Sequence, residues 1–140
     1  MTSFLTYRGT VYPWHCDQVG HMNVMWYVGK FDEATWNFAA QLGLTPSYLR
    51  QSNRGMAAVQ QTIHYKRELL AGDVVEVHTR LLELREKVVR FAHEMRNSET
   101  GEIAATCELT GVHLDRQLRK ACAFPPEVRA AGLKILGSEP

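Results

Sequence analysis

The residues best suited to chemistry lie in one short segment, His15-Cys16-Asp17-Gln18-Val19-Gly20-His21-Met22-Asn23. Its central carboxylate, Asp17, precedes a turn eased by Gly20 and lies just before a long apolar run. Asn23 is a good N-cap, because its side-chain oxygen can accept hydrogen bonds from the free N–H groups of a first helical turn. The segment therefore predicts a carboxylate held close to the start of a helix.

The helix that must position these residues is predicted to run from Val24 to Gly43. Apolar side chains recur along it at helical spacing: Tyr27, Phe31, Ala34, Phe38 and Leu42. Its first turn offers unpaired N–H donors and a partial positive charge, so the Val24 N–H can stabilise the oxyanion formed when a carbonyl is attacked. A carboxylate and an oxyanion donor together can perform acyl transfer. Alternatively, Asp17 and Asn23 only satisfy turn and cap hydrogen bonds.

The remaining elements are predicted mainly from a period of two. A first strand covers Tyr7–Trp14, and alternation predicts four further strands over 57–65, 75–81, 89–95 and 103–111, joined by turns at 85–87 and 97–102. Short helices are expected at Ser47–Gln51 and Glu127–Leu133. One apolar helix with one large antiparallel sheet favours an α+β layer in which the sheet curls around the helix. Such a layer leaves sheet edges open, and dimerisation would cover them.

The length, charge and cysteine content of the chain exclude several classes of protein. With 140 residues, we expect a single domain spanning 1–140. The net charge of +1 gives no electrostatic case for nucleic acid, and no apolar run is long enough to cross a membrane. Three cysteines without a CxxC pattern, and a start that lacks the features of a signal peptide, favour a cytoplasmic protein.

The segment Asp17–Asn23, followed by Tyr27 and then Phe31-Asp32, resembles the signature of hotdog-fold acyl-CoA thioesterases, in particular their 4-hydroxybenzoyl-CoA thioesterase branch. Gly72-Asp73 is a second, weaker match, and the resemblance covers roughly residues 5 to 125. It implies a hotdog fold with about five strands around one long helix. It also implies dimers, often paired into tetramers, with active sites between subunits. The implied reaction converts acyl-CoA and water into a carboxylic acid and free CoA, with no metal and no cofactor.

The resemblance also implies roles for single residues. The carboxylate matching Asp17 attacks the thioester carbonyl or activates a water to do so, and the sequence leaves both routes open. Alignment of the motif agrees with the Val24 N–H as oxyanion donor, while His21 either bonds Asp17 or lines the acyl pocket. The predicted substrate-binding set is His21, Asn23, Tyr27, Val59, Gln61, Arg85, Lys87 and Arg119.

Two parts of this set depend on distant segments. Val59 and Gln61 belong to the strand expected to line the partner subunit's pocket. Arg85, Lys87 and Arg119 match basic positions that bind CoA phosphates, and the alternative for each is a solvated surface charge.

Other interpretations remain beside the thioesterase. A non-catalytic acyl-CoA or acyl-carrier binding module could use the same groove. His15, Cys16, Asp17 and His21 fit no common zinc spacing, so no metal site is expected. His15 is read as structural or pocket-lining. If Trp14, Trp26 and Tyr65 converge, they could cage a quaternary ammonium acyl group through cation–π contacts.

Overall fold

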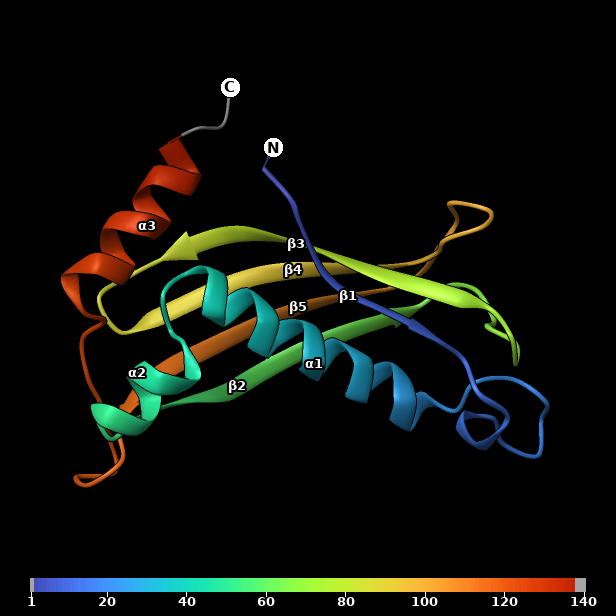
Figure 1. Cartoon of the computed structure of the whole chain (residues 1–140), viewed down its shortest axis with the longest axis horizontal. Helices are drawn as coiled ribbons and strands as arrows, with labels where there is room; N and C mark the ends of the chain where they lie inside the picture. Colours follow the sequence, from blue (N-terminus) through green and yellow to red (C-terminus); the bar gives the residue numbers. More distant parts are fainter. Residues whose placement is uncertain (1, 138–140) are drawn as a thin grey trace.

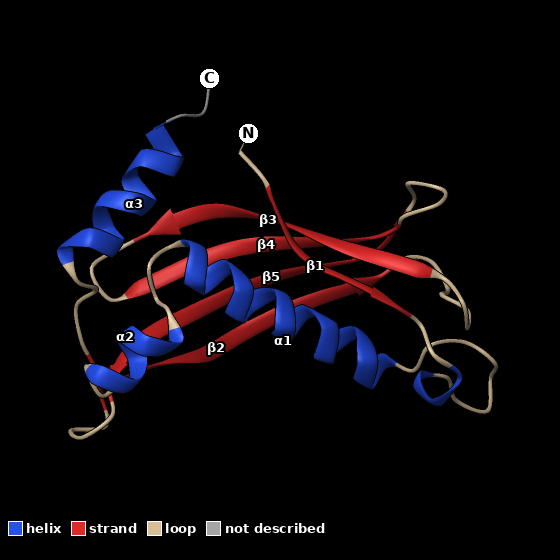
Figure 2. Ribbon diagram, in the orientation of Figure 1, coloured by secondary structure: helices blue, strands red, loops and turns tan. Residues whose placement is uncertain are grey.

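The structure is a computed structural model that describes residues 2–137, so the first residue and last three residues of the predicted domain lie outside it. In chain order the elements are β1 (Phe4–Thr10), η1 (Pro13–His15), α1 (Val24–Gln41), α2 (Pro46–Gln51), β2 (Arg54–Tyr65), β3 (Val74–Leu84), β4 (Val88–Asn97), β5 (Ile103–Asp115), β6 (Lys120–Ala121) and α3 (Pro126–Gly137). Figures 1 and 2 show the sheet curving around α1. The predicted α+β arrangement is confirmed.

The sheet is antiparallel throughout, with the strand order β1-β3-β4-β5-β2 and with β6 paired to β5. β2 therefore pairs with β5 on one side and ends the sheet on the other. None of its twelve residues is fully buried. Its pairing with β5 shifts register between Ala58 and Gln60, and Val59 in this bulge is 61% exposed. β2 is thus a long open edge, the feature expected to form a dimer.

α1 begins at Val24 as predicted, because the Asn23 side chain accepts the Met25 N–H at 2.9 Å. One face is buried against the sheet; for example, the ring centroids of Phe38 and Phe91 lie 5.2 Å apart. The helix ends at Gln41 rather than Gly43, which has a φ of +102° and turns the chain away.

Several element bounds differ from the prediction. β1 ends at Thr10 rather than Trp14, because Pro13 begins a 3-10 turn, in which its fixed φ and missing N–H are tolerated. α3 is longer at both ends than the predicted 127–133. β6 was not predicted, because two residues carry no readable alternation.

A buried polar chain joins the sheet to α1. The Thr35 hydroxyl donates to the Phe31 carbonyl at 2.9 Å, so its oxygen is left to accept the Nε2–H of His93, also at 2.9 Å. The Thr79 hydroxyl then donates to Nδ1 of His93 at 2.6 Å, and Thr6 contacts Thr79 at 2.8 Å. His93 is completely buried, and this burial lowers its pKa to about 4. A neutral histidine therefore fixes the middle of α1 to β4.

Candidate active site

Asp17 lies in a closed turn between η1 and α1. Its N–H donates to the His21 carbonyl at 3.1 Å, and its own carbonyl accepts the Gly20 N–H at 3.0 Å. Gly20 has a φ of +95°, a conformation that glycine adopts without strain. The Met22 N–H donates to the Leu69 carbonyl at 2.8 Å and so ties the turn to the loop before β3. The turn is a small, internally bonded unit anchored to the sheet.

The Asp17 carboxylate is fixed by two donors while it stays near solvent. Its Oδ1 accepts the Val19 N–H at 2.9 Å, and its Oδ2 accepts the Asn23 Nδ2–H at 2.8 Å. These bonds, first the one from Asn23 and then the one from Val19, lower the pKa of Asp17 below its ordinary value. Asp17 is therefore ionised at neutral pH, and each oxygen keeps a further lone pair for a substrate or water.

Asn23 connects this carboxylate to the helix mouth. Its amide nitrogen donates to Asp17, while its amide oxygen accepts the Met25 N–H. Its backbone N–H donates to the His15 carbonyl at 2.8 Å. The sequence predicted the cap but missed the bond to Asp17. The Val24 N–H belongs to the first helical residue and so has no intrahelical acceptor.

A groove of about 360 Å³ opens beside this first turn. Its lining residues are His21, Met22, Val24, Tyr27, Tyr65, Lys66, Arg67 and Glu68. His21 Nδ1 contacts Glu68 Oε1 at 3.0 Å, so this histidine bonds Glu68. We call this space the helix-mouth groove; it brings together His21, Val24 and Tyr27 of the predicted set.

Two aromatic side chains of the helix-mouth groove hold each other. The rings of Tyr27 and Tyr65 lie edge to face, with centroids 5.2 Å apart, and the Tyr27 hydroxyl donates to the Arg67 carbonyl at 3.0 Å. Tyr65 is 49% exposed. Glu68 was absent from the predicted set, since nothing local in the sequence links it to His21.

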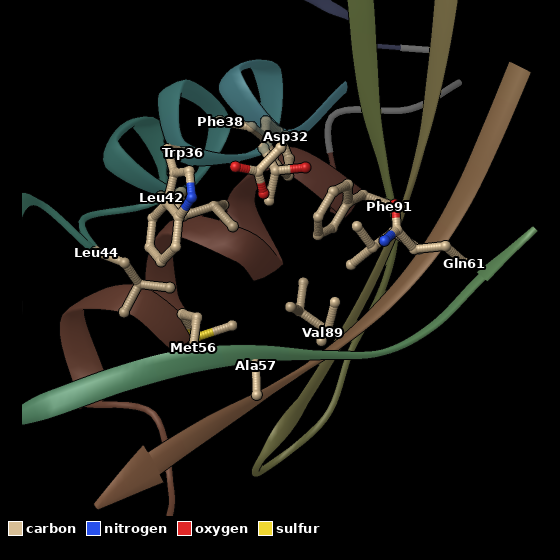
Figure 3. Close-up of a pocket in the computed structure, with 15 residues that line it drawn as sticks. Asp32, Trp36, Phe38, Leu42, Leu44, Met56, Ala57, Gln61, Val89 and Phe91 are labelled. Atoms are coloured by element: carbon tan, nitrogen blue, oxygen red, sulfur yellow. The ribbon is translucent and has the colours of Figure 1, made fainter. Parts of the chain in front are cut away.

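Gln61, on β2, lines a narrow apolar pocket of about 60 Å³ between the sheet and a later part of α1 (Figure 3). Asp32, Trp36 and Met56 also line the pocket. Asp32 follows Val24 by eight residues, which corresponds to roughly 12 Å along a helix. Val59 is outside both the pocket and the helix-mouth groove.

Arg85, Lys87 and Arg119 are not near Asp17 within one protomer. Arg85 and Lys87 form the β3–β4 turn and Arg119 the β5–β6 turn, at the end of the sheet opposite the start of α1 (Figure 1). Arg85 pairs with Glu83 at 3.3 Å. A CoA molecule therefore reaches both ends only if a second subunit contributes one of them.

The three rings considered for a cation cage separate into two places. Trp14 and Trp26 both contact His15, with ring centroids 5.8 and 4.5 Å away, whereas Tyr65 contacts Tyr27 in the helix-mouth groove. His15 is 9% exposed and lines a different cavity.

Among residues 2–137, no helix has the length and apolarity needed to cross a bilayer.

The sequence matches the Thioesterase-like superfamily over residues 11–132. The L-carnitine dehydrogenase/betainyl-CoA thioesterase of Agrobacterium fabrum is 32% identical over 115 residues, which cover 82% of this chain and 23% of that protein. The chain thus spans about a quarter of that relative's length. The betainyl-CoA thioesterase of Pseudomonas aeruginosa is 26% identical, with 89% of this chain and 79% of that protein covered.

The fold has close structural counterparts. A Staphylococcus aureus protein solved in complex with CoA has a TM-score of 0.90 with 20% identity, covering 100% of this chain and 89% of that chain. At this identity the likeness concerns the fold alone. The hotdog resemblance predicted from the Asp17–Asn23 motif is confirmed, and the chain belongs to the thioesterase-like superfamily.

Proposed function

We propose that this thioesterase hydrolyses acyl-CoA where the helix-mouth groove adjoins the Asp17 turn, with Asp17 as the reacting carboxylate and the Val24 N–H as the oxyanion donor. The observation that carries the proposal is Asn23, which holds the ionised carboxylate with one end of its amide and caps α1 with the other. One side chain thereby sets the carboxylate and the helix mouth relative to each other.

Two routes are compatible with this geometry. In the first, Asp17 attacks the thioester carbonyl, the carbonyl oxygen takes up negative charge at the Val24 N–H, and CoA leaves as a thiolate. Water then cleaves the mixed anhydride and restores the carboxylate. In the second, Asp17 removes a proton from a water that attacks directly. Both give a carboxylic acid and free CoA.

We propose that the site is completed in a homodimer formed through β2. This strand is an open edge of roughly 40 Å at 3.3 Å per residue, with exposed Val59 near its middle. Pairing with its own copy across a two-fold axis makes the two β2 strands antiparallel. The partner subunit's Arg85, the partner subunit's Lys87 and the partner subunit's Arg119 then lie at the same end of the joined sheet as Asp17.

We further propose that the acyl group is small and cationic, of the trimethylammonium type. The A. fabrum and P. aeruginosa relatives are named for betainyl-CoA. In a betainyl group one methylene separates the ammonium from the thioester carbonyl, so its site must adjoin the Val24 N–H. The Tyr65 ring and the Glu68 carboxylate line the groove that contains Val24 and offer cation–π and ionic contacts. The apolar pocket beyond Asp32 is too far along α1 for so short a group.

A substrate panel tests the reaction. Free thiol release should fall at least about a hundredfold in Asp17→Asn, because general-base catalysis alone contributes that much. Asp73→Asn is the matched control: Asp73 also accepts a turn N–H, from Leu70 at 2.8 Å, and an asparagine oxygen can do the same. No turnover of any thioester by the wild type, with acyl-CoA binding retained, would instead establish a binding module.

A pair of isosteric substrates tests the acyl group. Betainyl-CoA and 3,3-dimethylbutyryl-CoA have the same shape and differ only in charge. A cation–π contact of about 1 kcal/mol corresponds to roughly a fivefold preference for betainyl-CoA in kcat/KM. Equal values for the two would refute the cationic acyl group while leaving the thioesterase intact.

A further inference from the structure

A third, larger cavity lies on the flank of α1 opposite the helix-mouth groove. It has a volume of about 560 Å³ and is lined by β1, η1 and the first half of α1. The helix contributes Trp26, Lys30 and Glu33 to this cavity, whereas it contributes Val24 and Tyr27 to the helix-mouth groove. The proposed hydrolysis uses none of the cavity's residues, and we call it the flank cavity.

The flank cavity contains a buried cation. Lys30 is 3% exposed, and its ammonium donates to the Tyr7 hydroxyl at 2.9 Å and lies 5.1 Å from the centre of the Tyr7 ring. Among residues 2–137, no ion pair within 4 Å includes Lys30. A buried charge with no counter-charge in contact is costly, and an ammonium has three donors to satisfy. An anion in the cavity would meet both needs.

Tyr7 and His15 also line the flank cavity, and each can donate a hydrogen bond to a ligand there. The Tyr7 ring folds over Gly9 so closely that a side chain on Gly9 would collide with the Tyr7 hydroxyl. His15 Nδ1 accepts the Tyr12 N–H at 3.0 Å, so in the neutral ring the proton is on Nε2. Burial, and then the charge of Lys30, lower the pKa of His15 and keep it neutral.

One wall of the flank cavity is a pair of stacked aromatic rings, the Tyr12–Trp14 stack. The rings of Tyr12 and Trp14 stack with centroids 4.5 Å apart and planes within 5°. They are nevertheless 46% and 67% exposed, which is unusual for large aromatic side chains. A planar ligand can therefore stack on an outer face of this pair while an anionic group reaches toward Lys30.

We propose that the flank cavity binds a phosphorylated purine nucleoside, with its base on the outer face of the Tyr12–Trp14 stack and a phosphate at Lys30. A lysine binds phosphate as a point charge, and bases stack on aromatic side chains whatever their sequence. Glu33 lies at the exposed rim, where its negative charge opposes the entry of an anion. Removal of this charge should therefore tighten the binding of an anion.

Calorimetric titration of the full chain tests the contact between the phosphate and Lys30. The probes are adenosine 3′,5′-bisphosphate, AMP, adenosine and inorganic phosphate. Lys30→Met should weaken the bisphosphate about tenfold or more and leave adenosine unchanged, because a charge-assisted hydrogen bond is lost. Glu33→Gln should tighten the bisphosphate. The control is Lys134→Met, an exposed lysine on α3 outside the flank cavity, which should change nothing.

Trp14→Leu keeps the test decisive if Lys30→Met does not fold, because Trp14 is exposed. It should weaken every purine probe about tenfold and leave inorganic phosphate unaffected. No binding of any probe to the wild type would overturn the proposal. The proposal would also be overturned if Glu33→Gln weakened the binding of choline and Lys30→Met tightened it, because these effects define a cation site.

Kinetics distinguish two sources of the nucleotide, and this step alone rests on the proposed function. If the ligand is the nucleotide end of CoA, Trp14→Leu raises the KM for acyl-CoA but not for the acyl-pantetheine that lacks the nucleotide. If it is a free nucleotide, AMP binds alongside CoA and both KM values stay unchanged. Either result supports the flank cavity, and the titrations need no turnover.

Discussion

Replacing His93 by glutamine should make the stability of this protein less sensitive to acid. In the native state the pKa of His93 is about 4, against 6.5 in the unfolded chain, because the ring is buried. The unfolded state therefore binds more protons between these values, and folding stability falls as the pH drops from about 7 toward 4. The full effect of 2.5 pKa units is about 3 kcal/mol.

The measurable window lies above the titration of the carboxylates. Between pH 7.5 and 5.0 the His93 contribution should fall by about 2 kcal/mol, which is most of the full effect. Urea unfolding of the wild type and of His93→Gln at both pH values gives the difference directly. His15 and His113, whose pKa values burial also lowers, remain in both proteins and cancel in the comparison.

His78→Gln is the control for this experiment, since His78 is partly exposed and its ring bonds Glu76 at 3.0 Å. It should lose as much stability between pH 7.5 and 5.0 as the wild type does. If His93→Gln also loses as much as the wild type, the buried neutral histidine is not the source of the acid sensitivity.

Three further predictions concern the site. Asn23→Ala removes the chief cause of the lowered Asp17 pKa, so the acid limb of the kcat/KM profile should move to higher pH; the lost cap should also cost about 1 kcal/mol in urea unfolding. Val59→Lys places a charge on the β2 edge and should shift the proposed dimer toward monomer in light scattering, whereas an unchanged mass would exclude that edge as the interface. Arg85→Gln with Lys87→Met should raise the KM for acyl-CoA severalfold at low salt with kcat unchanged; equal KM values would assign both cations to the solvated surface.

The features that were predicted correctly depend on residues that lie close together in the sequence. Asn23 was identified as a cap because a cap acts over two residues, and β2 and β5 were identified because alternation with a period of two needs no knowledge of the partner strand. The bond between His21 and Glu68 joins residues 47 apart. It exists only because the loop before β3 returns to the Asp17 turn, and no local pattern encodes that return.

The placement of Arg85 could not have been predicted from matched positions alone. A family motif aligns residues along the chain, whereas a phosphate site requires that they meet in space. Strands of ten to thirteen residues place successive turns at opposite ends of the sheet, so Arg85 and Asp17 are separated by the strand length. The partner subunit's Arg85 lies at the same end of a joined sheet as Asp17 only if the two β2 strands pair antiparallel.

The rigidity of α1 matters to the proposed chemistry. Oxyanion stabilisation depends on a donor that does not need to reorganise when charge develops. The Val24 N–H is fixed from two directions: Asn23 bonds the first turn to Asp17, and the Thr35–His93 contact ties the middle of α1 to the sheet. His93→Gln should therefore lower kcat more than it raises KM, because it loosens the donor without touching the substrate. A change confined to KM would mean that α1 keeps its position without this contact.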